Sequence, residues 1–134
     1  MKYEGNLIIT TGNASDFSEL VEVTGYLEIN ADAQLPKLTT VGGFLYIRAD
    51  AQLPKLTTVV GSLYIRADAQ LPKLTKAHGK FGKLICVSEY GLWASEDGKF
   101  YAGCRTDFTK EKALEHWDRE DERARKFTAA ILAI

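Results

Sequence analysis

One nine-residue phrase, ADAQLPKLT, occurs three times without a substitution, at residues 31–39, 49–57 and 67–75. The flanking residues follow the same period, so three gapless copies of 18 residues fill positions 23–76. A degenerate copy precedes them and carries two extra residues in the turn at 10–15. A unit this small cannot bury its own apolar side chains, so stacking on its neighbours is the solution open to it.

Each copy contains one clear strand signal. Leu45 and Ile47 alternate with Tyr46 and Arg48, which is the period of a strand with one buried face. Leucine and valine then recur every three residues, spacing that favours a tight or 3₁₀-like return, and Pro54 indicates a corner or an unpaired edge. Stacked copies would align like residues in columns, with the aliphatic columns forming the core. We therefore expect a mainly β fold: a short single-layer parallel β-solenoid of about four 18-residue coils.

The last third of the chain has a different pattern. The segment LWASEDGKFYAG (92–103) predicts a β-hairpin that turns at Asp97-Gly98. Thr109 is suited to cap a following helix, and the chain after it predicts one helix or two. An open solenoid end exposes core and unpaired strand groups, so these elements are expected to cap it. The sequence thus predicts a repeat region (1–80) and a hairpin plus helical cap (81–134) within one cooperative α+β domain.

Composition and motifs argue against several functions. The net charge is −1, so the chain lacks the basic field typical of a general nucleic-acid binder. The N-terminal apolar run is too short for a signal peptide or membrane helix. Four residues with metal-binding side chains are spaced 8, 18 and 12 residues apart, unlike the close pairs of zinc sites: His78, Cys86, Cys104 and His116. We expect reduced cysteines, no cofactor, no metal, no catalytic residues and no enzyme activity.

Two columns on the outer face of the strand are candidates for partner binding. Tyrosine and arginine are enriched at interfaces, and neighbouring arginines repel each other unless an anion faces them. The hairpin adds two aromatic candidates. The predicted partner-binding residues are Glu28, Asn30, Tyr46, Arg48, Tyr64, Arg66, Trp93 and Tyr101. Other columns have plainer interpretations: Asp32, Asp50 and Asp68 as turn residues bonding their own backbone, and Lys37, Lys55 and Lys73 as a solvated row.

The pattern L-x-x-V-x-G-x-L-x-I over residues 38–47 resembles a shortened leucine-rich repeat and the receptor L-domain type of β-helix. PKLTTVGG resembles repeats of small solenoid proteins of bacteria and prophages, and YAGCR with TKEKALEHW resembles C-terminal segments of small prophage proteins. The resemblance implies a recognition scaffold in a mobile-element setting. We expect a non-catalytic protein-binding module in the bacterial cytoplasm, such as an anti-CRISPR-like inhibitor that blocks a host defence protein or ribonucleoprotein complex.

Three alternatives stay open. The arginine, lysine and tyrosine columns would also suit nucleic acid or a nucleoprotein, although direct nucleic-acid binding is not the favoured mode. A Cys/His pair with His116 as base would make a small hydrolase, but no flanking motif supports it. The apolar C-terminus FTAAILAI (127–134) would cover either the chain's own cap or a second copy in a homodimer.

Overall fold

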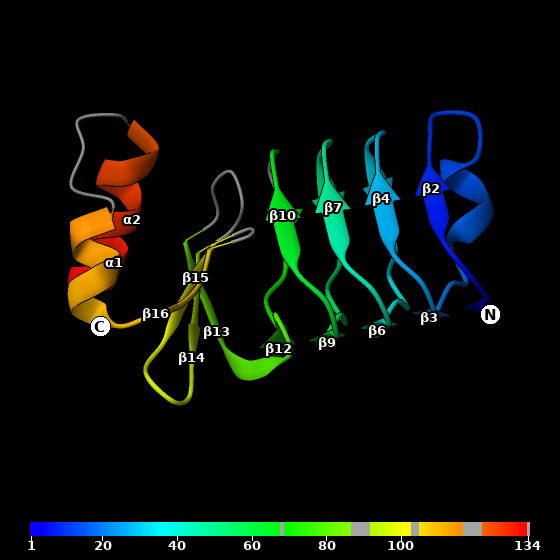
Figure 1. Cartoon of the computed structure of the whole chain (residues 1–134). Coiled ribbons are helices and arrows are strands. Elements are labelled where there is room, and N and C mark those ends of the chain that lie inside the picture. The colour runs from blue at the N-terminus through cyan, green and yellow to red at the C-terminus, as the bar shows by residue number, and fades with distance from the viewer. Residues whose placement is uncertain (68, 87–91, 103–104, 117–121, 134) are drawn as a thin grey trace.

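The computed structural model describes residues 1–67, 69–86, 92–102, 105–116 and 122–133. Its first part is a parallel β-solenoid of about four coils (Figure 1). The coils place short strands in three sheets, and like strands of successive coils pair in parallel. The predicted solenoid is therefore confirmed, with more strands per coil than the sequence indicated.

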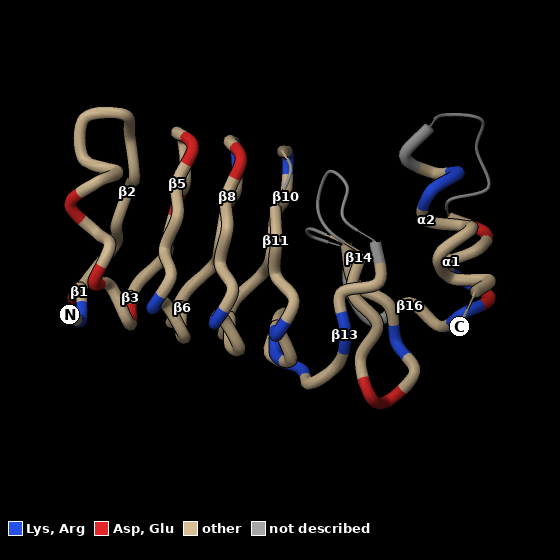
Figure 2. The backbone as a smooth tube through the Cα atoms, turned by 180° about the vertical axis from the view of Figure 1, so that it is seen from behind, with Lys and Arg blue, Asp and Glu red and all other residues tan. Residues whose placement is uncertain are grey.

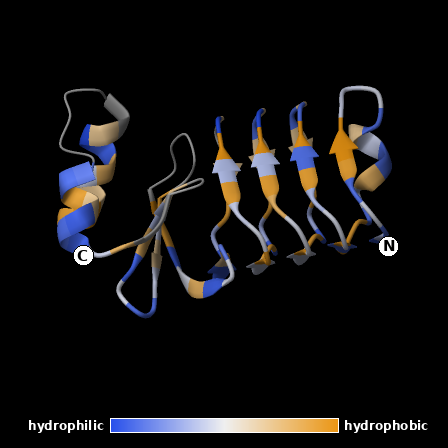
Figure 3. Ribbon diagram, in the orientation of Figure 1, coloured by the Kyte–Doolittle hydropathy of each residue, from blue (hydrophilic) through white to orange (hydrophobic). Residues whose placement is uncertain are grey.

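The strands of the four-stranded sheet follow the predicted L-x-I segments. They are β2 (Leu7–Ile9), β4 (Leu27–Ile29), β7 (Leu45–Ile47) and β10 (Leu63–Ile65). The outer leucine and isoleucine of each strand point into the core, whereas the middle residue faces outward. Figure 3 shows this as hydrophobic colour on either side of a paler or hydrophilic middle in β4, β7 and β10.

Two further sheets complete the coils. The three-stranded sheet consists of β5 (Ala33–Gln34), β8 (Ala51–Gln52) and β11 (Ala69–Gln70). The solenoid part of the nine-stranded sheet consists of β1 (Lys2–Tyr3), β3 (Glu22–Val23), β6 (Thr40–Val41), β9 (Thr58–Val59) and β12 (Lys76–Ala77). The predicted proline corner is a turn, closed in one coil by the Leu56 amide donating to the Leu53 carbonyl oxygen at 3.3 Å. The predicted 3₁₀-like return thus consists of a single hydrogen bond between residues three positions apart.

The core is built from aligned columns, as the period predicted. Leu27 pairs with Leu45 and Leu45 with Leu63, and all three are fully buried. Corner glycines let successive coils approach. The amide of Gly43 donates to the carbonyl oxygen of Gly25 at 2.8 Å, and a Cβ on Gly43 would lie only 2.8 Å from the next backbone nitrogen of the coil below. No larger residue fits there without moving the backbone.

Different elements cover the two ends of the solenoid. At the N-terminal end, the two extra residues of the degenerate coil form part of a loop with a 3₁₀ helix, η1 (Ala14–Phe17). Its Phe17 ring packs edge-on against Tyr3, with centroids 6.0 Å apart, and both side chains lie against the core. At the other end the nine-stranded sheet continues through four antiparallel strands: β13 (Lys80–Cys86), β14 (Leu92–Ser95), β15 (Phe100–Ala102) and β16 (Arg105–Phe108).

The predicted hairpin is β14 and β15, in which Trp93 pairs with Tyr101. Alternate residues of these strands enter two different cores. Trp93 and Tyr101 join the solenoid core, whereas Leu92 and Phe100 join a second core under the helices. Both faces of the hairpin are therefore covered (Figure 1).

The C-terminal segment forms two helices, α1 (Lys110–His116) and α2 (Glu122–Leu132). Thr109 caps α1 as predicted, because its Oγ1 accepts a hydrogen bond from the Lys112 amide at 3.2 Å. Phe127 and Ile131 of α2 are buried in the second core, so this part of the apolar C-terminus covers the chain's own cap. None of the described helices has the length and apolarity that crossing a membrane requires.

Candidate functional site

The outer face of the four-stranded sheet brings most of the predicted binding residues together. Glu28, Tyr46 and Tyr64 lie in register on adjacent strands, as the period predicted. Asn30, Arg48 and Arg66 follow two residues later in the chain, on the same face. Parallel pairing therefore holds these side chains in two adjacent rows.

Two arginines converge on one tyrosine. The Tyr46 hydroxyl oxygen accepts hydrogen bonds from Arg66 Nη1 at 3.2 Å and from Arg48 Nη2 at a longer 3.5 Å. The Arg48 guanidinium carbon also lies 4.7 Å from the centre of the Tyr46 ring, within cation–π distance. Hydrogen bonds from Arg48 and then Arg66 hold the pKa of the Tyr46 phenol below its usual range. Both cations thus favour negative charge at this point of the surface.

Glu28 supplies a counterion to one of the two arginines. Its Oε1 lies 4.0 Å from Arg48 Nε, at the outer limit of an ion pair, and its side chain is 23% exposed. A contact this long beside solvent contributes little stability. Glu28 therefore offsets the positive charge of the pair only in part.

Aromatic rings continue this surface along the coil axis. Tyr26 and Phe44 stack with their centroids 4.6 Å apart and their planes 7° from parallel. Tyr46 and Tyr64 stack more loosely at 5.6 Å and 30°, and Phe44 meets Tyr64 edge-on at 6.2 Å. We name this surface the aromatic–arginine face, made up of Tyr26, Phe44, Tyr46, Tyr64, Arg48 and Arg66.

Tyr26 and Phe44 were missed at the level of sequence. A signal was present, since the two aromatics are 18 residues apart and lie two positions before Glu28 and Tyr46, hence on the same face of the strand. Both residues come just before a regular strand. At such positions the alternation of the strand gives no reason to expect ordered side chains. Their half-buried rings extend the predicted face by one row.

The prediction that Trp93 and Tyr101 form a partner-binding surface is wrong for this structure. Their side chains are 0% and 3% exposed, because the hairpin presses them onto the end of the solenoid core. His78 joins them, with its ring stacked on Tyr101 at 5.5 Å. Burial lowers the pKa of His78 to about 4, and neither ring nitrogen has a hydrogen-bond partner among the described residues. These residues close the solenoid.

The candidate metal and nucleophile residues do not assemble within the described part of the chain, where no three His, Cys, Asp or Glu side chains form a metal-binding group. His78 lies in the solenoid cap, whereas His116 ends α1 and contacts the Phe108 ring at 5.1 Å. Cys104 and the side chain of Cys86 fall outside what the structure describes. Neither the zinc nor the Cys/His alternative gains support.

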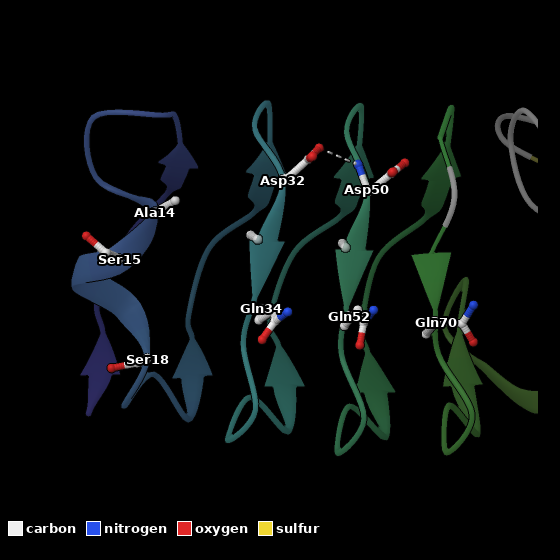
Figure 4. Close-up of a pocket in the computed structure, with 10 residues that line it drawn as sticks. Ala14, Ser15, Ser18, Asp32, Gln34, Asp50, Gln52 and Gln70 are labelled. Carbon is white, nitrogen blue, oxygen red and sulfur yellow. Dashed lines mark hydrogen bonds between the residues drawn. The ribbon is translucent and has the colours of Figure 1, made fainter.

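A concave feature lies on the opposite side of the solenoid from the aromatic–arginine face. A groove of about 720 Å³ crosses the outer face of the three-stranded sheet, with η1 as one wall (Figure 4). A row of glutamines, Gln34, Gln52 and Gln70, lines it below the aspartates. Asp32 accepts a hydrogen bond from the Asp50 amide at 3.2 Å, so its carboxylate bonds the next coil and not its own turn as predicted. The third aspartate of the column, Asp68, lies outside the described residues.

On this side of the solenoid, the two ends of the strands carry opposite charges. Figure 2 shows acidic residues at one end of β5 and β8, and basic residues at the turns that follow the other end. Among the described residues that line the groove there is no aromatic or arginine side chain of the kind that typically anchors interfaces. The aromatic–arginine face is therefore the stronger candidate site.

Comparison of the chain with known protein families, with curated proteins and with solved structures gave no match.

Proposed function

We propose that the protein is a non-catalytic binding module that recognises another protein through the aromatic–arginine face. The observation that carries the proposal is the convergence of Arg48 and Arg66 on the Tyr46 hydroxyl. Strand pairing between β4, β7 and β10 holds these residues in place before a partner arrives. A preorganised surface loses less side-chain freedom on binding, which favours affinity.

The ring geometry favours a protein over a nucleic acid. Single-stranded nucleic acids bind by laying bases on open aromatic faces. Here Tyr26 and Phe44 already cover one face of each other, and the Tyr46 ring contacts both Tyr64 and the Arg48 guanidinium. A protein side chain can pack against ring edges as well as faces, so it suits this surface better.

The nature of the partner is suggested by sequence resemblance. The repeats resemble those of small bacterial and prophage solenoid proteins, which makes a host defence complex the first class of partner to test. Binding of an anti-CRISPR-like inhibitor would block a site on such a complex by occupying it. The support for this part of the proposal is the resemblance of the repeats.

Capture from a bacterial lysate, followed by reconstitution with the purified partner, tests the function. The lysate is nuclease-treated, and the bait is wild type, a Tyr46→Ser/Tyr64→Ser variant or a Gln52→Ser/Gln70→Ser control. The control changes outward residues of the same coils on the opposite side of the solenoid. Thermal unfolding followed by circular dichroism verifies that all three are folded.

A partner that binds wild type and the glutamine control, but binds the tyrosine variant at least tenfold more weakly in calorimetry, supports the proposal. Retention of every partner by the tyrosine variant contradicts it, since the face would then contribute nothing. A partner lost from the glutamine control alone would move the binding surface to the groove.

Nucleic-acid binding is a second candidate, favoured by the two adjacent guanidinium groups of Arg48 and Arg66. It predicts a gel shift of single-stranded DNA or RNA at low salt, with affinity that falls steeply as salt increases. Absence of a shift at 20 mM salt, or a flat salt response, rejects it.

A further inference from the structure

The first coil ends the four-stranded sheet, and one side chain lies along the outer edge of its strand. Among the described residues β2 pairs with β4 and has no strand on its other side. We propose that Asn13 closes this edge, so that a second copy of the chain does not pair with β2 and extend the solenoid end to end. This role is independent of the partner that the aromatic–arginine face binds.

Alternate residues of β2 direct their backbone groups to opposite sides of the strand. The Leu7 amide and the Ile9 carbonyl oxygen both bond backbone groups of the second coil. The backbone groups of Ile8 and Thr10 consequently point away from the second coil, toward the outer edge of the sheet. Groups on such an edge are the ones through which another strand would pair.

The Asn13 carboxamide bonds these edge groups as a neighbouring strand would. Its Nδ2 donates to the Ile8 carbonyl oxygen at 3.0 Å, and its Oδ1 accepts a hydrogen bond from the Thr10 amide at 2.7 Å. The Asn13 and Ala14 amides also donate to the Thr10 carbonyl oxygen, at 3.2 and 2.9 Å. In a parallel pair, one residue of the next strand would donate and accept at the same Ile8 and Thr10 atoms. The carboxamide thus occupies the positions that a pairing strand requires.

The departure of the first coil from the repeat places Asn13 at this edge. Residues 10–17 take the path that the shorter segment 30–35 takes in the next coil. Asn13 holds the N-cap position of η1, yet its side chain makes no capping hydrogen bond to that described helix. η1 itself packs beside β5, the last described strand of the three-stranded sheet at this end (Figure 4). The same insertion therefore covers the edges of two sheets.

A second copy of the chain is the partner that an open β2 edge would accept. Ile8 points outward from β2 and is 41% exposed, whereas the next two coils carry Glu28 and Tyr46 at this position. Two first coils related by a two-fold axis would pair their β2 strands antiparallel and bring their Ile8 side chains together. Exposed edge strands with apolar side chains are the usual points of such pairing.

Sedimentation velocity of the full-length protein over a hundredfold range of concentration tests the role of Asn13. Asn13→Ala removes the carboxamide, and Asn6→Ala is a matched control, because the Asn6 Oδ1 accepts a hydrogen bond from the Tyr26 amide of the second coil. A double variant adds Ile8→Lys to Asn13→Ala, since lysine on an edge strand hinders pairing. Its control adds Val60→Lys, which changes an exposed apolar side chain of a later coil.

Two further measurements separate closure of the edge from local structure. A loop replacement exchanges residues 10–17 for the NADAQL of positions 30–35, which removes Asn13 and η1 together and restores the 18-residue period. Amide hydrogen exchange by NMR at low concentration follows the Thr10 amide, which donates to Asn13 in the wild type. Circular dichroism verifies that each variant is folded.

The expected result is self-association at least tenfold tighter for Asn13→Ala than for wild type and Asn6→Ala, and tighter still for the loop replacement. Ile8→Lys should return the Asn13→Ala protein to wild-type behaviour, whereas Val60→Lys should not. Exchange of the Thr10 amide should be at least tenfold faster in the Asn13→Ala monomer than in wild type.

Equal self-association of wild type and Asn13→Ala would overturn the proposal, even with faster exchange at Thr10, because the side chain would then have a structural role alone. Self-association of the loop replacement without that of Asn13→Ala would assign the closure to η1 and likewise overturn the role of Asn13. Association of Asn13→Ala that Ile8→Lys leaves unchanged would also overturn it, since the copies would then pair elsewhere. If the loop replacement is unfolded, the comparison of Asn13→Ala with Asn6→Ala decides.

Discussion

Mild acid should destabilise the fold through His78. The imidazole is largely buried among the rings of Trp93 and Tyr101, which offer it no compensating charge. Burial penalises the charged form and lowers its pKa from 6.5 to about 4. The unfolded chain exposes this group to water, so its pKa there returns to the ordinary value.

The sign and size of the effect follow from linkage. Well above pH 6.5 the imidazole is neutral in both states and contributes no pH dependence. At pH 5 the ratio of protonated to neutral imidazole is about 30 in the unfolded chain and about 0.1 in the folded protein. Unfolding therefore takes up a proton, and the free energy of unfolding falls by about 2 kcal/mol between pH 7 and pH 5. The loss approaches about 3 kcal/mol once the pH falls below 4.

Urea denaturation at pH 7, 6 and 5, for wild type and a His78→Asn variant, measures this loss. Asparagine tolerates the positive φ of 54° at this position and does not titrate. Wild type should lose about 2 kcal/mol more stability than the variant between pH 7 and pH 5. Glu19 and Asp97 have pKa values lowered below 4.5 and 3.8, so their stabilising contributions are present above those values and are lost only at lower pH. Equal pH dependence in the two proteins would refute the reasoning.

Three further substitutions test the packing of the coils and cap. Leu45→Ala should lower the free energy of unfolding by about 2–5 kcal/mol in urea denaturation, because the side chain is fully buried between equivalent leucines. As a control, Val60→Ala should change it little, because Val60 is exposed. Gly42→Ala would place a Cβ 2.2 Å from a carbonyl oxygen of the preceding coil and should lower the melting temperature sharply; Gly12→Ala meets its nearest neighbour only at 3.8 Å and should be near neutral. Thr109→Ala should cost about 1 kcal/mol through loss of the α1 cap, and an unchanged stability would contradict the capping assignment.

The repeat period was enough to predict the solenoid and its columns, because each 18-residue step returns a residue type to the same position in the coil. It was not enough to predict three sheets. Ala33–Gln34 and Thr40–Val41 are strands of only two residues, too short to show a period of two. What makes them strands is pairing with the next coil, an interaction between residues 18 positions apart that no local pattern encodes.

The hairpin illustrates the same limit at the candidate site. Alternation of Leu92, Trp93 and Ala94 indicates two faces, but it does not show whether water or protein covers either one. A tryptophan and a tyrosine on the outward-looking face of an isolated hairpin would be interface candidates. In the folded chain they cover the last coil of the solenoid instead, which requires knowing where the hairpin packs.

On the four-stranded sheet, the three regular copies differ where they face outward and agree where they face inward. Leu27, Leu45 and Leu63 are identical, as the stacked core requires, whereas the outward residues of the same strands change from Glu28 to tyrosine in the next two coils. The arginine also appears only in those two coils, where the first has asparagine. A pair of cations at one tyrosine therefore exists only because two neighbouring copies share the same outward residues. The glutamate of the preceding copy ends the row with the opposite charge, so the position of each copy in the stack, and not its sequence alone, sets the chemistry of the face.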